Sequence, residues 1–142
     1  MMKNRLFNLF VLIFFFSPSI LMANTQYFAD GLSLFKSKKF NEAKFKFEQD
    51  IVFNPKSEMS YLYLSKIFQN LDNKELEEQN LNTVILLNPK NEEAVYNLAK
   101  LKLDASDYKK SKELNDRLME VCNKFCEKSK KLKKEIENLS KK

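Results

Sequence analysis

Two cysteines are the side chains in this sequence that could most readily form a covalent bond or bind a metal ion. Cys122 and Cys126 are the only cysteines among the 142 residues, and the chain contains no histidine. It therefore lacks the commonest general base, the commonest neutral metal ligand and the usual partner of a nucleophilic serine or cysteine. Two thiolates alone fill half of a tetrahedral metal site. The pair could form a disulfide or a redox dithiol, and we expect no metal site.

Adjacent carboxylates are the other candidates for chemistry. They occur as Glu77-Glu78 and as Glu92-Glu93. Neighbouring residues of a helix point in different directions, so neither pair suits joint acid and base catalysis, and we expect both on solvated helix faces. The chain has a single glycine, so a glycine-rich phosphate-binding loop is excluded. We predict no catalytic residue, no cofactor and no enzymatic activity.

The positive charge of the chain lies at its two ends. The formal net charge is +6, but residues 1–23 contribute two positive charges and residues 127–142 contribute four. The body between them is neutral, with 16 basic and 16 acidic side chains. A nucleic-acid-binding domain usually has its basic patch on the folded body. We therefore expect no nucleic-acid partner.

Residues 1–23 have the order of a secretory signal peptide. The first five residues are basic, residues 6–16 are almost wholly apolar, and Pro18 between two serines precedes Ala23, after which we expect cleavage. An uncleaved membrane anchor is the alternative, although residues 6–22 only approach the length that spans a bilayer. A signal peptide predicts export across the inner membrane, with the mature protein in the periplasm.

Export favours one state of the two cysteines. An oxidising compartment is where a pair of cysteines closes into a disulfide. Three residues separate Cys122 from Cys126, whereas a redox dithiol usually has two intervening residues and lies near a βαβ pattern. We predict a structural disulfide, and a redox dithiol is the alternative.

A four-residue pattern recurs in the middle of the chain. Phe53-Asn54-Pro55-Lys56 is followed by Leu87-Asn88-Pro89-Lys90. The interval between the two prolines matches the roughly 34 residues of one tetratricopeptide-repeat (TPR) unit, a helix-turn-helix. The chain resembles the TPR family. The resemblance implies an all-α solenoid with units at residues 24–57, 58–91 and 92–125 and a capping helix within residues 126–142.

Most signature positions of the family are matched in the first unit and fewer in the later ones. Matching residues are Tyr27, Gly31, Leu34, Phe40, Ala43 and Phe47, then Tyr61, Leu64, Ser65, Phe68, Leu81 and Val84, then Val95, Leu98, Ala99, Tyr108, Leu114 and Leu118. Glu77 departs from the pattern because it stands where the two helices of a unit approach most closely. We expect the second hairpin to be splayed or slipped by one residue.

Helix boundaries follow from the residues themselves. Pro55 and Pro89 end the helices that precede them, and Ser57, Asn73, Asn91 and Asp107 stand where N-caps are needed. Leu132, Ile136 and Leu139 recur at helical spacing in the last segment, which predicts a basic amphipathic helix that covers the third unit.

The resemblance also implies where a partner binds. In TPR proteins the first helix of each unit lines a concave groove, and the corresponding residues here include Phe28, Phe35, Leu62, Lys66, Tyr96 and Lys100. We predict that this groove takes a peptide or a helix of another envelope protein. The apolar first helix makes homo-oligomers through the first repeat a second expectation.

The basic last segment allows another function. Lys128, Lys130, Lys131, Lys133 and Lys134 could place the helix on an anionic membrane surface. The alternative function is thus a peripheral membrane-surface adaptor, but we favour a structural cap with solvated lysines.

Overall fold

The computed structural model describes residues 26–141, and every regular element in this range is an α-helix. The helices are α2 (Gln26–Lys36), α3 (Phe40–Phe53), α4 (Glu58–Asn70), α5 (Lys74–Leu87), α6 (Glu92–Asp104), α7 (Tyr108–Val121) and α8 (Cys126–Leu139). The predicted all-α class is confirmed. The predicted signal peptide at residues 1–23 lies outside the described residues. Within the described part, no helix is long and apolar enough to cross a membrane.

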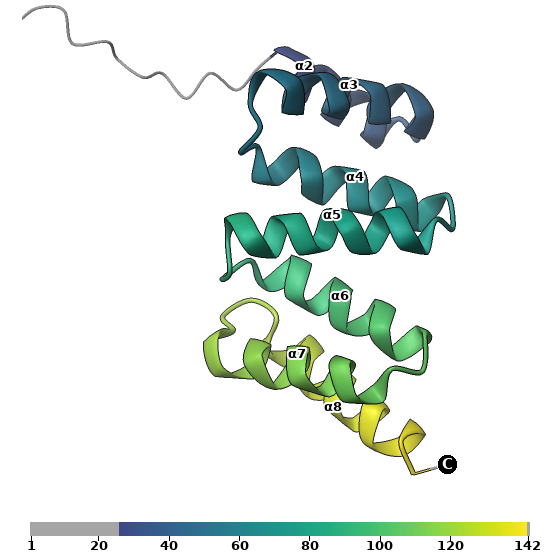
Figure 1. Cartoon of the computed structure of the whole chain (residues 1–142), viewed down its shortest axis with the longest axis vertical. Coiled ribbons are helices and arrows are strands. Elements are labelled where there is room, and N and C mark those ends of the chain that lie inside the picture. Colours follow the sequence, from purple (N-terminus) through teal and green to yellow (C-terminus); the bar gives the residue numbers. More distant parts are fainter. Residues whose placement is uncertain (1–25, 142) are drawn as a thin grey trace, which may run out of the picture.

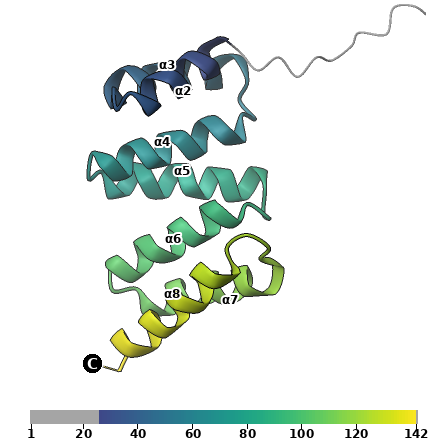
Figure 2. The same cartoon turned by 180° about the vertical axis from the view of Figure 1, so that it is seen from behind.

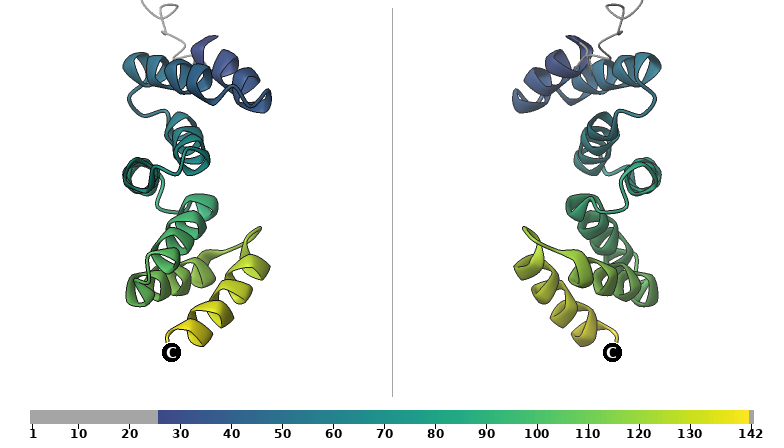
Figure 3. Two further views of the ribbon diagram at one scale, coloured as in Figure 1. Left: turned by 90° about the vertical axis from the view of Figure 1, so that its right-hand side faces the viewer. Right: turned by 90° about the vertical axis from the view of Figure 1, so that its left-hand side faces the viewer.

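The helices stack along one axis in chain order (Figure 1, and from behind in Figure 2). Helices α2 and α3, α4 and α5, and α6 and α7 form three hairpins, and each hairpin packs on the next through its second helix. Helix α8 packs on α7 and also contacts α6. Seen along the side in Figure 3, left, the first hairpin and α8 extend further to the right than α4 and α6. The stack therefore curves inward on this side.

The same turn closes all three hairpins. Lys38, Asp72 and Ser106 have positive φ angles of 59°, 53° and 60°, and they recur at equal intervals along the chain. In each turn the next residue's N–H donates to the carbonyl five positions earlier, as from Lys39 to Leu34. This is the hydrogen-bond pattern of a Schellman motif, in which the left-handed position is usually glycine. The second hairpin has the same turn as the others, so the expected slip at Glu77 is wrong.

Glu77 is accommodated by burial of its side chain instead. Only 4% of the residue is exposed. Burial raises the pKa of the Glu77 carboxyl above its ordinary value, and the negative charge of Asp104 adds to this effect, while Lys74 opposes it. The second hairpin thus keeps its register, and the Glu77 carboxyl group is buried between its helices and their neighbours.

Two apolar clusters form the core and meet at α4. Leu64, Ile67 and Phe68 of α4 pack with Ala43 and Phe47 of α3. Leu62 belongs to the second cluster, which extends through α5, α6 and α7 to α8. In the first hairpin, a Cβ atom on Gly31 would lie 2.9 Å from the Phe47 ring. The single glycine of the chain therefore serves the close approach of two helices.

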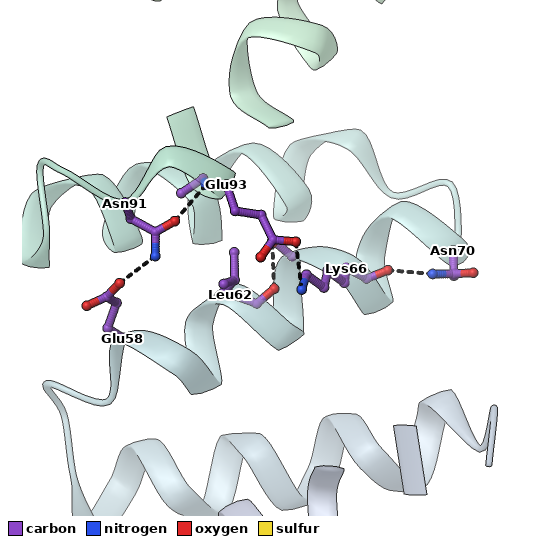
Figure 4. A network of polar contacts seen from close by, with 8 residues as sticks. Glu58, Leu62, Lys66, Asn70, Asn91 and Glu93 are labelled. Carbon is purple, nitrogen blue, oxygen red and sulfur yellow. Dashed lines mark hydrogen bonds and ion pairs between the residues drawn. The ribbon is translucent and has the colours of Figure 1, made fainter. Parts of the chain in front are cut away.

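Polar contacts fasten each hairpin to the next. The carboxylate of Glu58 accepts a hydrogen bond from the side-chain amide of Asn91 (Figure 4) and another from that of Asn88. One repeat later, Glu92 accepts from the backbone N–H groups of Lys124 and Phe125 at 2.9 and 2.8 Å. Backbone donors favour the charged carboxylate and lower the pKa of Glu92. The first residue of each of these helices therefore holds the start of the next repeat.

Three of the four predicted N-caps cap their helices through the side chain. Asn73, Asn91 and Asp107 accept hydrogen bonds from backbone N–H groups three residues later. Ser57 stands at the N-cap of α4 as predicted, but its side chain makes no capping hydrogen bond. Its hydroxyl donates to Ser60, whose own hydroxyl donates to the buried carboxylate of Asp50 on α3. The serine contributes to the junction between the first two hairpins instead of capping.

Helix α8 takes the place of a fourth first helix. It begins as far after the start of α6 as α6 begins after the start of α4, and its buried Leu132 and Ile136 join the second apolar cluster. The hydroxyl of Ser129 donates to the side-chain oxygen of Asn115 on α7 at 2.8 Å, and the amide of Asn115 donates back to the Ser129 carbonyl at 3.1 Å. Both residues are buried. The predicted capping helix is confirmed, with a satisfied polar pair inside its interface.

Neutralising Glu77 should stabilise the protein at neutral pH. Because the pKa of Glu77 is raised in the folded state, its charge penalty appears as pH rises from about 4.5 through that raised value. Glu77→Gln should therefore increase the free energy of unfolding by about 1 kcal/mol at pH 7, and the gain should vanish below pH about 4. Urea titrations at several pH values measure this.

The exposed Glu75 on the same helix supplies the matched control. Glu75→Gln should produce no comparable pH-dependent gain. A Glu77→Gln variant that is less stable than the parent at pH 7 would show that the carboxylate stabilises the hairpin.

Candidate functional site

Side chains of successive first helices touch along the inward-curving side of the stack. Here the first-helix face means the face formed by Phe28, Leu32, Phe35, Lys36, Met59, Leu62, Lys66, Gln69, Asn70, Tyr96, Lys100, Leu103 and Asp104. Phe28 and Phe35 of α2 contact Tyr63 of α4, and Lys66 of α4 contacts Glu93 of α6. Tyr96 of α6 contacts Phe125, the residue before α8. Side-chain contacts between successive first helices therefore run along this side from α2 to the start of α8.

An aromatic cluster occupies the N-terminal part of the face. The ring of Tyr63 lies 6.0 Å from that of Phe28, 5.1 Å from that of Phe35 and 5.2 Å from that of Phe47. Phe28 and Phe35 are half-buried, so part of each side chain packs inside the protein and is not accessible to a partner. The sequence analysis did not identify Tyr63 as part of this site. Two tyrosines that are two positions apart in one helix, Tyr61 and Tyr63, lie on different sides of it, which could have indicated a second apolar side of α4.

The predicted groove residue Leu62 belongs to the core, and so does Leu103 of the same face. Leu62 is 2% exposed and Leu103 is 4% exposed. Both lie in the cluster that includes Val84 of α5 and Ala94 of α6, where α5 and α6 pack together. The prediction that Leu62 is open to a partner is wrong. Leu32 is half-buried and Met59 is 43% exposed, so these two residues provide the accessible apolar surface near the first junction.

The two predicted lysines differ in their surroundings. The ammonium group of Lys66 lies 2.8 Å from a carboxylate oxygen of Glu93 (Figure 4) and 4.9 Å from the centre of the Tyr63 ring. Lys66 therefore links α4 to α6. Lys100 is half-buried, and within residues 26–141 no hydrogen bond, ion pair or ring contact engages its ammonium group. Of the two, Lys100 is the cation available to a partner.

Tyr96 lies in a basic and aromatic group between α6 and α8. Its ring centre is 5.5 Å from that of Phe125. The ammonium group of Lys128 lies 4.4 Å from the centre of the Phe125 ring and 5.6 Å from that of Tyr96. Attraction between a cation and the ring faces holds Lys128 at this place. Sequence reasoning assigned Lys128 to a solvated tail, and the ring contacts place it beside Tyr96.

Apolar side chains are also exposed on the outer side of the first hairpin. On α3, Phe45, Val52 and Phe53 are 58%, 75% and 67% exposed. Tyr27 of α2 stacks on Phe53 with ring centres 5.3 Å apart. The exposed apolar surface of the first repeat therefore lies chiefly on its second helix, and not on the first helix that the sequence suggested.

The carboxylate pairs face solvent only in part, because the side chains of Glu78 and Glu93 are 38% and 37% exposed and Glu77 is buried. Glu78 pairs with Lys102 of α6, and Glu93 pairs with Lys66 of α4. Glu77 is buried and Glu92 holds the loop before α8. The four carboxylates thus have separate structural surroundings. Within residues 26–141, no group of three potential metal ligands could hold an ion.

Cys122 and Cys126 lie at the loop between α7 and α8, where the structure joins them in a disulfide with Cα atoms 5.2 Å apart. The loop they close is also held by Glu92 through Lys124 and Phe125. A short covalent ring and a carboxylate together fix the start of α8.

The sequence and the structure were compared with those of known proteins. No protein-family model matches the chain, and no curated protein sequence matches it. Solved structures do match. The Yersinia enterocolitica type III secretion chaperone SycD, in complex with a peptide of the translocator YopD, has a TM-score of 0.72 at 17% identity, covering 81% of this chain and 90% of that one. The first TPR of Spaghetti (RPAP3), bound to an HSP90 peptide, has a TM-score of 0.68 at 17% identity, covering 81% and 88%.

This chain has the TPR fold. PcrH in complex with the chaperone-binding region of PopD supports the same assignment, with a TM-score of 0.69 at 15% identity over 81% of this chain and 89% of that one. The predicted resemblance to TPR proteins is therefore confirmed at the level of the fold. In TPR terms, α2, α4 and α6 are the first helices of three units, and α8 stands where the first helix of a fourth unit would stand.

The disulfide leads to a direct test. Protein folded in an oxidising compartment and alkylated before denaturation should show no modified cysteine, and both should react after reduction. Reduction should lower the free energy of unfolding by about 2 kcal/mol, the loop-entropy value for a ring of this size. Mass spectrometry and urea titration measure the two effects, and a Cys122→Ser, Cys126→Ser variant should not respond to reductant. Labelling of both native cysteines would refute the structural disulfide.

Proposed function

We propose that this protein is a non-catalytic interaction module that binds a peptide or a helix of another protein on its first-helix face. The observation that carries the proposal is that side-chain contacts run along this face over three TPR units while Leu32, Met59, Tyr96 and Lys100 on it remain partly open to solvent. Three structures of similar fold are described as complexes with a peptide or a binding region. The likeness supports the same use of the fold here.

The arrangement of the hairpins suits the binding of a ligand without catalysis. Hairpins that are fastened to one another by Glu58, Glu92 and the Lys66–Glu93 pair form a preorganised surface. A preorganised surface loses little conformational entropy when a ligand binds. Apolar contacts at Leu32 and Met59 would contribute affinity, and polar groups further along the face would set orientation.

The cell envelope is the proposed location. The signal-peptide pattern of residues 1–23 supports export, and two cysteines placed to form a disulfide suit an oxidising periplasm. The partner would then be another envelope protein or a peptide derived from one. The neutral body gives no support to a nucleic-acid partner.

The alternative is a peripheral membrane-surface adaptor that uses α8. Lys130, Lys131, Lys133 and Lys134 of this helix are exposed. However, the apolar side of α8 is turned into the protein, because Leu132 and Ile136 are 1% and 3% exposed. A helix without a free apolar side can bind lipid only through charge, which is weak at physiological salt. The first-helix face is therefore the better candidate.

Binding through the first-helix face is tested by substitution. Leu32→Glu, Met59→Glu and Tyr96→Glu together should abolish capture of a specific envelope protein, because they place charges on partly exposed apolar positions. Leu86→Glu, Met119→Glu and Val121→Glu together provide a matched control, since these side chains are exposed elsewhere. Circular dichroism verifies that both variants fold. Equal loss in both variants, or retention by the first, would contradict the proposal.

Self-association through the first repeat is a separate proposal. It is supported by the exposed Phe45, Val52 and Phe53 of α3. Multi-angle light scattering should show a mass that rises with concentration, and Val52→Glu should return the protein to the monomer mass. A monomer mass at all concentrations would remove this proposal without affecting the other.

A further inference from the structure

Large apolar side chains are exposed where the second helix of each unit ends. They lie within the last two residues of α3, α5 and α7, and they are Val52, Phe53, Leu86 and Val121. Leu86 is 81% exposed and Val121 is 49% exposed. A single exposed apolar residue is common on protein surfaces, but its recurrence at equivalent places in three units indicates a surface that binds something.

A lysine follows each of these helix ends. Lys56, Lys90 and Lys124 stand two residues before the first residues of α4, α6 and α8, at equal intervals along the chain. All three are exposed, and no ion pair within residues 26–141 engages their ammonium groups. Each loop that follows a second helix therefore combines exposed apolar surface with a lysine that lacks an internal counterion.

The three loops lie on one side of the molecule. The loops after α3, α5 and α7 are on the left in Figure 1 and on the right in Figure 2. We call the four apolar residues and three lysines named above the loop edge. The turns within the hairpins lie on the opposite side, and of these described turns only the second has an exposed large apolar residue, Leu71. The combination of apolar and basic side chains is thus particular to the loop edge.

Positive groups outnumber exposed negative groups beside the loop edge. The carboxylates of Glu58 and Glu92 are engaged by hydrogen bonds inside the protein. Arg117 of α7 adds a cation at the second loop, where its guanidinium group donates to the carbonyl of Pro89 at 2.8 Å. The opposing charge at the end of α7 is that of the exposed Glu120. An anionic surface therefore suits this side of the molecule.

We propose that the loop edge binds a phospholipid bilayer with anionic headgroups. Its four apolar side chains enter the interfacial region of the bilayer, and its three lysines contact the phosphate groups. The apolar stem of a lysine lets the ammonium group reach the headgroups while neighbouring side chains are buried. None of these residues belongs to the first-helix face. The inference therefore goes beyond the proposed function and leaves that face open to a partner.

Other arrangements fit the observations less well. In a symmetric dimer through the loop edge, the lysines of one copy would approach those of the other, and like charges repel. A protein partner would need a separate pocket for each protruding side chain, whereas a fluid bilayer adapts to them. On α8, the apolar Leu132 and Ile136 are buried, so its lysines could hold a membrane only through charge. The loop edge offers both kinds of contact.

Sedimentation with lipid vesicles tests the proposal in the full chain. The parent should bind vesicles of phosphatidylcholine with phosphatidylglycerol more tightly than vesicles of phosphatidylcholine alone. Leu86→Ser with Val121→Ser should weaken binding to the mixed vesicles at least about fivefold, because two apolar side chains no longer enter the interface. Lys90→Glu with Lys124→Glu should weaken this binding at least about tenfold, because charge reversal turns attraction into repulsion.

Matched controls change the same kinds of residue elsewhere. Lys133→Glu with Lys134→Glu makes the same charge change on exposed positions of α8, and Leu71→Ser removes an apolar side chain on the opposite side. Both controls should stay within about twofold of the parent, as expected for distant screened charges and for a residue away from the bilayer. Residues 1–23 are the same in every protein compared, so differences in binding arise from the substitutions. Circular dichroism verifies that each variant folds.

The outcomes are distinct. Loss of binding in both loop-edge variants with unchanged controls supports the proposal. Equal binding by the parent and both loop-edge variants would overturn it, and loss in the α8 variant alone would move the membrane contact to α8. Absence of vesicle binding by the parent would also overturn it, and capture of an acidic protein that the Lys90→Glu, Lys124→Glu variant loses would then identify a protein as the occupant.

Discussion

The structure depends on the fact that a helical hairpin of this size cannot cover its own apolar surface. Helix α4 shows the consequence most clearly, because Leu64, Ile67 and Phe68 pack toward the first hairpin while Leu62 packs toward the third. Each hairpin is therefore stable only between neighbours. At the C-terminal end, α8 supplies the missing neighbour by turning Leu132 and Ile136 inward and its lysines outward.

Polar groups then fix the angle and register that apolar packing leaves loosely defined. Glu58 and Glu92 each reach from the first residue of a helix to the beginning of the next repeat. At the last junction, Asn115 and Ser129 satisfy one another where other units have apolar or aromatic residues. Buried hydrogen bonds of this kind have strict geometry and are costly to leave unmade. They thus specify how the hairpins stack, and the shape of the first-helix face follows.

The fold could be predicted from the sequence because its strongest signals are local and periodic. The proline period and the spacing of apolar residues identified the repeat fold and the cap. Individual side-chain contacts could not be predicted in this way. Leu62 is buried because it packs with side chains of α5 and α6, and Glu93 pairs with Lys66 across two repeats. Both contacts depend on how the repeats stack, which the sequence of a single helix does not specify. Glu77 shows the opposite error, because this departure from the family pattern is accommodated by burial of its side chain, which raises its pKa, while the turn keeps the same hydrogen bonds.

The covalent ring at Cys122 and Cys126 is small in comparison with the elements around it. It spans four positions of the chain and joins no two distant helices. The contacts of α2 through α7 do not pass through it, and α8 is also held by Glu92, Asn115 and its own apolar residues. The arrangement of helices α2 to α7 therefore rests on noncovalent packing alone. The redox state of the compartment sets how firmly the last helix is held, and it does not select which helices pack together.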